Sequence, residues 1–306
     1  MALIKTFNFH RQLTGMLPQM GDTTFGNFLF YPGVALAERL HSHGYSYTAA
    51  DDFDIAVFCD LDQELLEYAK SLPQKIKKIL VLAESPAYCP FPHQPHVLMD
   101  SIWNHVLTFS REIHCRNITY YDIPVTGIQC PISPLTPVHG AQDKGVFIAR
   151  YKHDAIGNSL QRNALALQAM DNDDIEAFGG EWPPHKNYGG KTADKLRTIS
   201  QYKYSVIIEN AKYSGFVTEK IPESILAERP ALYFGDCIHA RRRYGETFVC
   251  MEDVTYEAFL AARAALLANY TYYYDQCLQE KSRSPQWIES FIEAMLGAIL
   301  QSQQAV

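Results

Sequence analysis

The chain has 306 residues, of which 47% are hydrophobic, and it carries a formal net charge of −7. This length accommodates about two domains, and the excess of acidic residues argues against broad binding to nucleic-acid phosphates. No apolar run reaches the 18 residues of a membrane-spanning helix, and the first residues lack the apolar core of a signal peptide. We therefore expect no integral membrane segment.

In the first half of the chain, short apolar runs alternate with helical patterns. Strands that alternate with helices indicate a parallel sheet, and hence a Rossmann-like domain. Glu84, in the tripeptide Glu84-Ser85-Pro86, comes directly after one of these strands, so we expect it at the carboxyl end of the sheet. The predicted strands are Leu3–Phe9, Asp54–Cys59, Ile76–Ala83 and Val106–Phe109, and the predicted helices are Val34–His41 and Gln63–Leu72.

The segment Pro131–Gly145 contains three prolines and small polar residues, a composition typical of a connection between domains. We place the domain boundary there, with a first domain at 1–140 and a second at 141–306. The second domain begins with a strand at Val146–Ala149 and repeats the alternation. Its further predicted elements are a helix at Arg162–Met170, a strand at Ile175–Phe178, and helices at Tyr256–Ala268 and Trp287–Leu300.

Two features near the end of the chain concern packing. The last predicted helix has a wide apolar face, which leaves open that it packs back on the first domain. The tyrosines at 270, 272, 273 and 274 form a dense aromatic cluster. We expect this cluster to pack between the last helices and the first domain rather than to stack against a sugar.

The cysteines give an expectation about the redox environment. An odd number of thiols at wide spacing, with no C-x-x-C pair, indicates neither a zinc site nor a disulfide framework. We therefore expect reduced thiols and a cytoplasmic location. The seven residues are Cys59, Cys89, Cys115, Cys130, Cys237, Cys250 and Cys277.

The segment from Gln201 to Asp236 carries the clearest functional pattern. A strand at Tyr204–Ile208, a helix at Ile221–Glu228 and a strand at Ala231–Phe234 form a βαβ unit. The loop after the first strand therefore leaves the carboxyl end of a parallel strand, where open α/β sheets bind ligands. The polar residues in and after this loop are Glu209, Asn210, Thr218, Glu219 and Lys220.

A carboxylate, a cation and a helix N-terminus together suit a hydroxylated, phosphorylated ligand. The alternative is a solvated first turn of a helix, with Thr218 as its cap. No G-x-G-x-x-G or G-x-x-x-x-G-K-[ST] motif occurs in the chain. The sequence therefore lacks the motifs that would indicate a dinucleotide-binding or Walker-type protein.

This segment resembles the signature of the α-1,3/4-fucosyltransferases, glycosyltransferase family ten. In that family an aromatic-rich strand ends in Glu-Asn, here Glu209-Asn210, and the following loop ends in Thr-Glu-Lys, here Thr218 to Lys220. The resemblance covers roughly residues 80–240. Within the family, this sequence is more similar to the bacterial, soluble branch. The resemblance implies a GT-B-like α/β fold, in which two Rossmann-like domains face each other across a cleft. The first domain would bind the acceptor and the second the nucleotide sugar.

The resemblance also implies an activity. The expected enzyme is an inverting glycosyltransferase that transfers L-fucose from GDP-fucose to a GlcNAc or Glc unit of a glycan, in α-1,3 or α-1,4 linkage. Two alternatives stay open: a transferase that uses another nucleoside diphosphate sugar, and a glycan- or nucleotide-binding relative without catalysis. Acceptor identity and oligomeric state are not readable from the residues.

Matching motifs assign expected roles to single residues. Glu84 corresponds to the family's catalytic base, in the motif Glu-Ser-Pro. Arg162, followed by Asn163, corresponds to a cation that neutralises the diphosphate together with Lys220, and a guanidinium can bind two phosphate oxygens at once. Glu219 corresponds to the carboxylate that accepts hydrogen bonds from the ribose.

The remaining expected donor-binding residues are Glu209, Asn210, Thr218 and Phe216. Phe216 stands where the family usually has Tyr, and Ala149-Arg150-Tyr151 stands where the first strand of the second domain usually ends in Ser-Asn. Arg162 and Lys220 are expected at loop or helix starts, where truncation costs little packing.

Two D-x-D sequences raise the question of a metal. They are Asp52-Phe53-Asp54 and Asp60-Leu61-Asp62. Asp60 and Asp62 lie where a strand passes into a helix, so capping explains them. Because Arg162 and Lys220 already supply positive charge for the diphosphate, we expect no required metal and no other cofactor.

Overall fold

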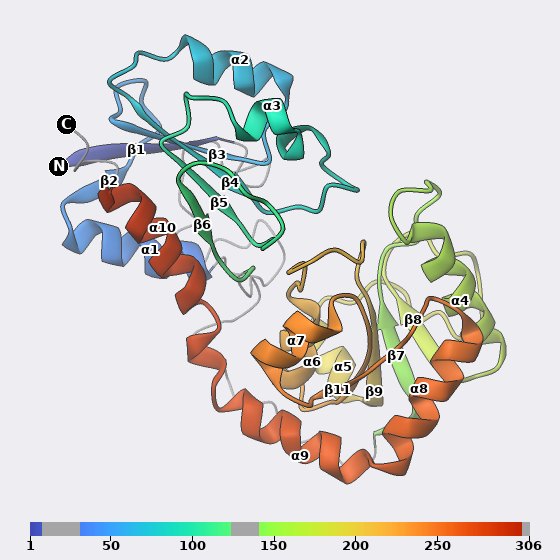
Figure 1. Ribbon diagram of the computed structural model, residues 1–306. Helices are drawn as coiled ribbons and strands as arrows, with labels where there is room; N and C mark the ends of the chain where they lie inside the picture. Colours follow the sequence, from blue (N-terminus) through green and yellow to red (C-terminus); the bar gives the residue numbers. More distant parts are fainter. Residues whose placement is uncertain (8–30, 124–140, 302–306) are drawn as a thin grey trace. The chain divides into compact units, whose positions relative to one another are not determined.

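The computed structural model describes residues 1–7, 31–123 and 141–301. The chain divides into two compact units, one containing Met1–Cys130 with Ile288–Val306 and the other Pro131–Trp287. Each unit is built on one parallel sheet with helices packed on it (Figure 1). The segment from Ile288 onward thus belongs with the first unit rather than with the part of the chain that precedes it.

The described part of the first unit contains a sheet in the spatial order β2-β1-β3-β4-β5-β6, in which all neighbouring strands are parallel. The central strands β3 and β4 are buried along nearly their whole length, as expected for a parallel sheet covered on both faces. The bounds are β1 (Ala2–Phe7), β2 (Tyr45–Tyr47), β3 (Ile55–Cys59), β4 (Lys77–Leu82), β5 (His105–Thr108) and β6 (Ile118–Tyr120).

Helices cover this sheet. The Asp62 side chain caps α2 by accepting a hydrogen bond from the Leu65 N–H at 2.9 Å, which confirms the capping role predicted for that aspartate. Arg39 of α1 forms ion pairs with Glu289 at 2.8 Å and Glu293 at 2.5 Å, both on α10. The helices of this unit are α1 (Tyr31–Ser42), α2 (Gln63–Ser71), α3 (Pro95–Leu98) and α10 (Glu289–Gln301).

The second unit has a sheet in the order β11-β10-β9-β7-β8. Its chain runs from β7 to β8 on one side and then returns to β9 on the other side of β7, so the strand order reverses between β7 and β9. Ligands bind at such a reversal, outside the carboxyl ends of the strands. The bounds are β7 (Gln142–Ile148), β8 (Ile175–Phe178), β9 (Tyr202–Ile208), β10 (Ala231–Phe234) and β11 (Phe248–Cys250).

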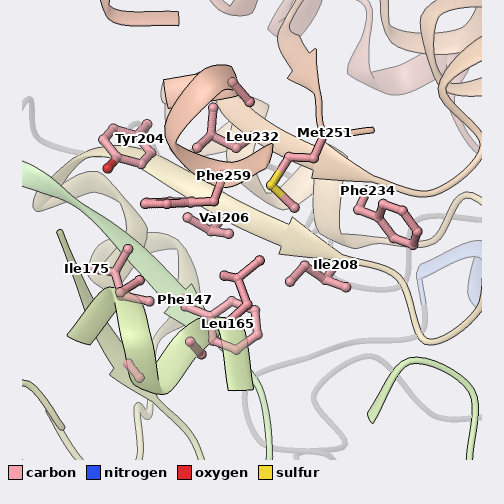
Figure 2. Close-up of a cluster of buried hydrophobic side chains, with 14 of the residues drawn as sticks. Phe147, Leu165, Ile175, Tyr204, Val206, Ile208, Leu232, Phe234, Met251 and Phe259 are labelled. Atoms are coloured by element: carbon pink, nitrogen blue, oxygen red, sulfur yellow. The ribbon is translucent and has the colours of Figure 1, made fainter. Parts of the chain in front are cut away.

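The main core of the second unit is drawn in Figure 2. Every second side chain of β9, at Tyr204, Val206 and Ile208, packs in this core together with Leu165 of α4 and Phe259 of α8. This alternation is the period of two of a β-strand. The helices of the unit are α4 (Ser159–Asp171), α5 (Lys195–Ser200), α6 (Lys220–Leu226), α7 (Cys237–Tyr244), α8 (Tyr256–Ala268) and α9 (Tyr270–Lys281).

The tyrosine cluster begins α9, and its contacts differ from the expected ones. Tyr270 and Tyr273 pack against the core of the second unit, and the Tyr270 hydroxyl donates to the Lys203 carbonyl at 2.8 Å. The prediction that this cluster packs against the first domain is therefore wrong for these two residues. Sequence alone could not choose the partner, because an aromatic face fits any apolar surface of suitable size.

Candidate functional site

The loop that follows β9 is organised around the carboxylate of Glu209, which is 0% exposed. It accepts hydrogen bonds from the Thr218 N–H at 2.9 Å and from the Thr218 hydroxyl at 2.9–3.0 Å. The Lys220 ammonium donates to it at 2.9 Å. Glu209 therefore holds the conformation of the loop through its buried carboxylate. The sequence pattern did not predict this structural role.

Lys220 lies at the first position of α6 and is 24% exposed at its side chain. Burial acts to lower the pKa of this ammonium, but the carboxylates of Glu209, Glu219 and Glu223 outweigh burial and raise it. The side chain thus stays charged at neutral pH. The expectation that its truncation costs little packing is wrong, because Glu209 would lose its counter-charge in a buried place.

Arg162, on the second turn of α4, is 4% exposed. Its guanidinium donates to the Asn210 side-chain oxygen and to the Arg150 carbonyl, both at 3.1 Å. Arg150 follows β7 and Asn210 follows β9, so this one side chain joins the two loops at the strand reversal. The prediction that truncating Arg162 costs little packing is therefore also wrong.

The N-terminal end of α4 is held to the same loop. The Asn158 N–H donates to the Asn210 carbonyl at 2.8 Å, and the Asn158 amide group donates to the Glu209 carbonyl at 3.2 Å. The α4 N-terminus, Arg162 and the loop after β9 consequently form one connected frame. Such a frame keeps cationic groups in place before a ligand arrives, which is what electrostatic stabilisation requires.

A cavity of about 40 Å³ lies among β7, β9 and α6. Its polar lining consists mainly of Arg162, Lys220 and Glu223, and the remaining walls come from the apolar ends of β7 and β9. Because roughly 10–15 Å³ suffices for one water, this space suits water rather than a nucleotide. Its significance is that both predicted diphosphate-binding cations line it.

Glu223 is a buried acid that the sequence pattern did not single out. Lys195 of α5 donates to its carboxylate at 3.1 and 3.3 Å. Burial raises the pKa of Glu223 to about 7, with Lys195 opposing the rise and Glu219 adding to it. A signal was present in the sequence: Glu223 lies three residues after Lys220, close to the same helix face.

Glu219 and Phe216 occupy different surroundings in the loop. Burial acts to raise the pKa of Glu219, but Lys220 and Lys195 outweigh it and lower the pKa. Glu219 is therefore an ionised acceptor, as a ribose diol requires. Phe216 is 2% exposed, so its ring packs inside the protein. Donor contacts of Phe216, Thr218, Asn210 and Glu209 stay predictions.

In the first unit, Glu84 follows β4 with its side chain exposed. Its N–H donates to the Asp60 carboxylate at 2.9 Å, and its carbonyl lies 2.9 Å from Nε2 of His93. The capping role predicted for Asp60 is wrong, because its side chain binds the backbone after β4 instead of a helix end. Across 1–7, 31–123 and 141–301, no group of three or more His, Cys, Asp or Glu residues is arranged to hold a metal ion.

Cys237 and Cys250 form a disulfide in the second unit, so the prediction of reduced thiols is wrong for this pair. Cys237 begins α7 just after β10, and Cys250 ends β11, the parallel neighbour of β10. The carboxyl ends of parallel strands meet at one edge of a sheet, which brings together two cysteines that lie 13 residues apart. Within the described residues, no helix is both long enough and apolar enough to cross a bilayer.

Comparisons with known proteins place the chain among glycosyltransferase folds. No family model matches the sequence. A fucosyltransferase-like protein of Arabidopsis thaliana is 24% identical over 169 residues, which cover 55% of this chain and 31% of that protein. The match thus spans about a third of the length of this curated relative.

Solved structures agree with this similarity. A crystal structure of an α1,3-fucosyltransferase matches with a TM-score of 0.57 and 15% identity, covering 95% of this chain and 90% of that one. An α1,3-fucosyltransferase with GDP-fucose gives 0.57 and 14%, covering 90% and 81%. A mutant of S. aureus TarM with fondaparinux, α-GlcNAc-glycerol and UDP gives 0.54 and 13%, covering 81% and 55%.

These comparisons confirm two predictions. The chain resembles fucosyltransferases, as its motifs indicate. It also has the paired parallel-sheet α/β domains of the GT-B glycosyltransferase fold.

Proposed function

We propose that this chain is a fucosyltransferase that moves L-fucose from GDP-fucose to a GlcNAc or Glc unit of a glycan, with inversion, in α-1,3 or α-1,4 linkage. The observation that supports this most is the convergence of Arg162 and Lys220 on one cavity at the strand reversal of the second unit. Two fixed cations, with an ionised Glu219 next to Lys220, suit a ribose joined to a diphosphate.

In the proposed reaction, the bond between the anomeric carbon and the diphosphate oxygen breaks while an acceptor hydroxyl oxygen bonds to that carbon. The electron pair of the broken bond goes to the diphosphate, whose growing negative charge Arg162 and Lys220 would stabilise. The hydroxyl proton would go to Glu84, acting as general base. A single displacement of this kind inverts the anomeric centre.

A second candidate keeps the fold and changes the donor to a uridine diphosphate sugar. It is favoured by the likeness to TarM, whose structure contains UDP. Diphosphate-binding cations do not distinguish the two bases, because both nucleotides carry the same diphosphate. The nucleotide that the second unit prefers therefore distinguishes the two candidates. A binding protein without catalysis is a third candidate, and it would show nucleotide binding without turnover.

We expect GDP to stabilise the protein against heat and UDP to do so much less. A ligand at 100 times its Kd adds about 2.7 kcal/mol to the free energy of unfolding. The measurement is a melting scan with no nucleotide, with GDP and with UDP. A shift with UDP alone would replace the proposed donor, and no shift with either nucleotide would contradict a nucleotide-sugar site.

We also expect transfer to survive chelation by EDTA. The reason is that Arg162 and Lys220 are proposed to neutralise the diphosphate in place of a divalent cation. The measurement is the turnover of GDP-fucose before and after EDTA, with Mn²⁺ or Mg²⁺ added back as the control. Loss of turnover that either ion restores would contradict this assignment.

A further inference from the structure

Asp60 stands directly after β3 and beside the end of β4, the strand that leads to Glu84. Its own N–H donates to the Val81 carbonyl at 3.0 Å, which continues the pairing of the two strands. Its carboxylate then accepts from the Ala83 N–H and from the Glu84 N–H, each at 2.9 Å and each through a different oxygen. The side chain thus extends the pairing of β3 with β4 by two more residues.

The backbone of Asp60 is in the left-handed region, with a φ of 42°. Few residues other than glycine adopt this conformation, although Asp and Asn tolerate it better than most. Residues held in sparsely populated conformations cluster at functional sites. At this position, the residue with this conformation has a carboxylate whose two oxygens accept from the N–H groups of Ala83 and Glu84.

The carbonyl group of Glu84 is held as well. A carbonyl oxygen only accepts hydrogen bonds, so Nε2 of His93 must carry the proton in its 2.9 Å contact with the Glu84 carbonyl. Burial lowers the pKa of His93, and the bond to this carbonyl opposes that shift. The ring is therefore a neutral donor near pH 7. Glu84 is consequently fixed through both its N–H and its C=O group.

We infer that Asp60 is a positioning residue for Glu84, which sets the place of the proposed base by binding the backbone on which it stands. This inference rests on the proposed function in naming Glu84 as the base. Asp60 touches neither donor nor acceptor in this account, because its oxygens are directed at backbone N–H groups. A misplacement of about 1 Å can cost roughly 10²-fold in rate, so such a residue matters without taking part in the chemistry.

Ionisation of Asp60 is part of the arrangement. Burial raises its pKa to about 6, the charge of Glu84 adds to the rise, and the two N–H bonds oppose it. A protonated carboxyl keeps one good acceptor oxygen and gains a donor, so protonation leaves one of the two N–H groups poorly bonded. Asp60 interacts electrostatically with Cys59, Glu84 and Tyr121. Two further titratable groups lie next to these residues: Cys89 interacts with Cys59, and His93 binds the Glu84 carbonyl.

The test compares Asp60→Asn and Asp60→Ala with wild type at pH 8, where wild-type Asp60 is ionised. Asn keeps one acceptor oxygen and tolerates the left-handed backbone, whereas Ala keeps none. We expect kcat to fall roughly 10- to 100-fold in the Asn variant and further in the Ala variant, with GDP affinity unchanged. Asp62→Asn is the matched control: it changes an aspartate two residues away, and Asn caps a helix as well as Asp does. We expect it to transfer like wild type.

Amide hydrogen exchange at Ala83 and Glu84 gives a readout that does not depend on activity. In Asp60→Asn we expect at least one of these amides to exchange more than 10-fold faster than in Asp62→Asn at the same pH. Unchanged exchange, or wild-type kcat at pH 8, would overturn the positioning role. If wild type transfers no sugar from any nucleotide sugar, the proposed function fails instead, and the exchange result alone then decides whether Asp60 holds this turn.

Discussion

Changing Glu84 to Gln is expected to lower kcat by roughly 10²- to 10⁴-fold, the usual contribution of a general base. The substitution preserves the shape of the side chain and most of its hydrogen-bonding capacity, but it removes the group that accepts the proton. Asp60 and His93 contact the backbone of Glu84, so both contacts survive the change. The measurement is the rate of fucose transfer at saturating donor and acceptor.

GDP affinity is the control for this variant. It should stay close to the wild-type value, because Glu84 belongs to the first unit and the predicted donor residues to the second. Normal turnover would move the base to another carboxylate of the first unit, with Glu112 and Asp122 as the next candidates. Loss of GDP binding would instead indicate that Glu84 has a structural role.

The sequence predicted the elements that carry a strong hydrophobic pattern. β10 and α8 have the predicted bounds, and β9 differs from its prediction by two residues at its start. These segments pair an apolar pattern with a clear stop, such as Pro230 before β10. The expected loop-to-helix transition at Thr218 to Lys220 is also where α6 begins.

Other elements were not predictable in this way, for physical reasons. The strands β2, β6 and β11 have three residues each, too few for a period of two to stand out. The helix α5 has six residues, and the charged turn of α7 conceals its short apolar face. Such elements owe their structure to the tertiary packing around them more than to local propensity.

The candidate site divides along the same line. Motif spacing identified which residues gather at the carboxyl edge of the second sheet, because that follows from βαβ topology. It did not reveal that Glu209 is buried beneath Lys220, or that Arg162 joins the loops after β7 and β9. Those contacts depend on which side chains meet across separate elements, and no periodicity encodes that.

The Lys220 contact leads to the second large expected effect. Changing Lys220 to Ala should lower the free energy of unfolding by about 3 kcal/mol, the lower end of the cost of breaking a buried ion pair. The reason is that the fully buried Glu209 carboxylate would lose the ammonium that pairs with it at 2.9 Å. The lower end applies because the Lys220 side chain is partly exposed. Denaturant unfolding measures this cost, and GDP affinity should fall in the same variant.

Because the folded-state pKa of Lys220 is raised, its contribution is complete below the ordinary lysine value of about 10.4. It is lost only as the pH rises through the higher folded value. The part of the cost that comes from the Lys220–Glu209 pair should therefore be the same at pH 8 and pH 9, both of which lie above the pKa of about 7 of the neighbouring Glu223.

Two comparisons separate stability from binding. Lys203→Ala is the matched control in β9: its partner Asp143 is 84% exposed at the side chain, and an exposed pair contributes about 1 kcal/mol or less. In the double variant Lys220→Ala with Glu209→Gln, the buried charge is removed together with its partner, so much of the lost stability should return while GDP affinity stays low. Recovery of both would make the loss of binding a consequence of misfolding, and would remove Lys220 from the proposed diphosphate site. Recovery of stability alone would show that the loss of binding does not follow from the loss of stability, and unchanged GDP affinity in Glu209→Gln alone would then assign that loss to the Lys220 ammonium.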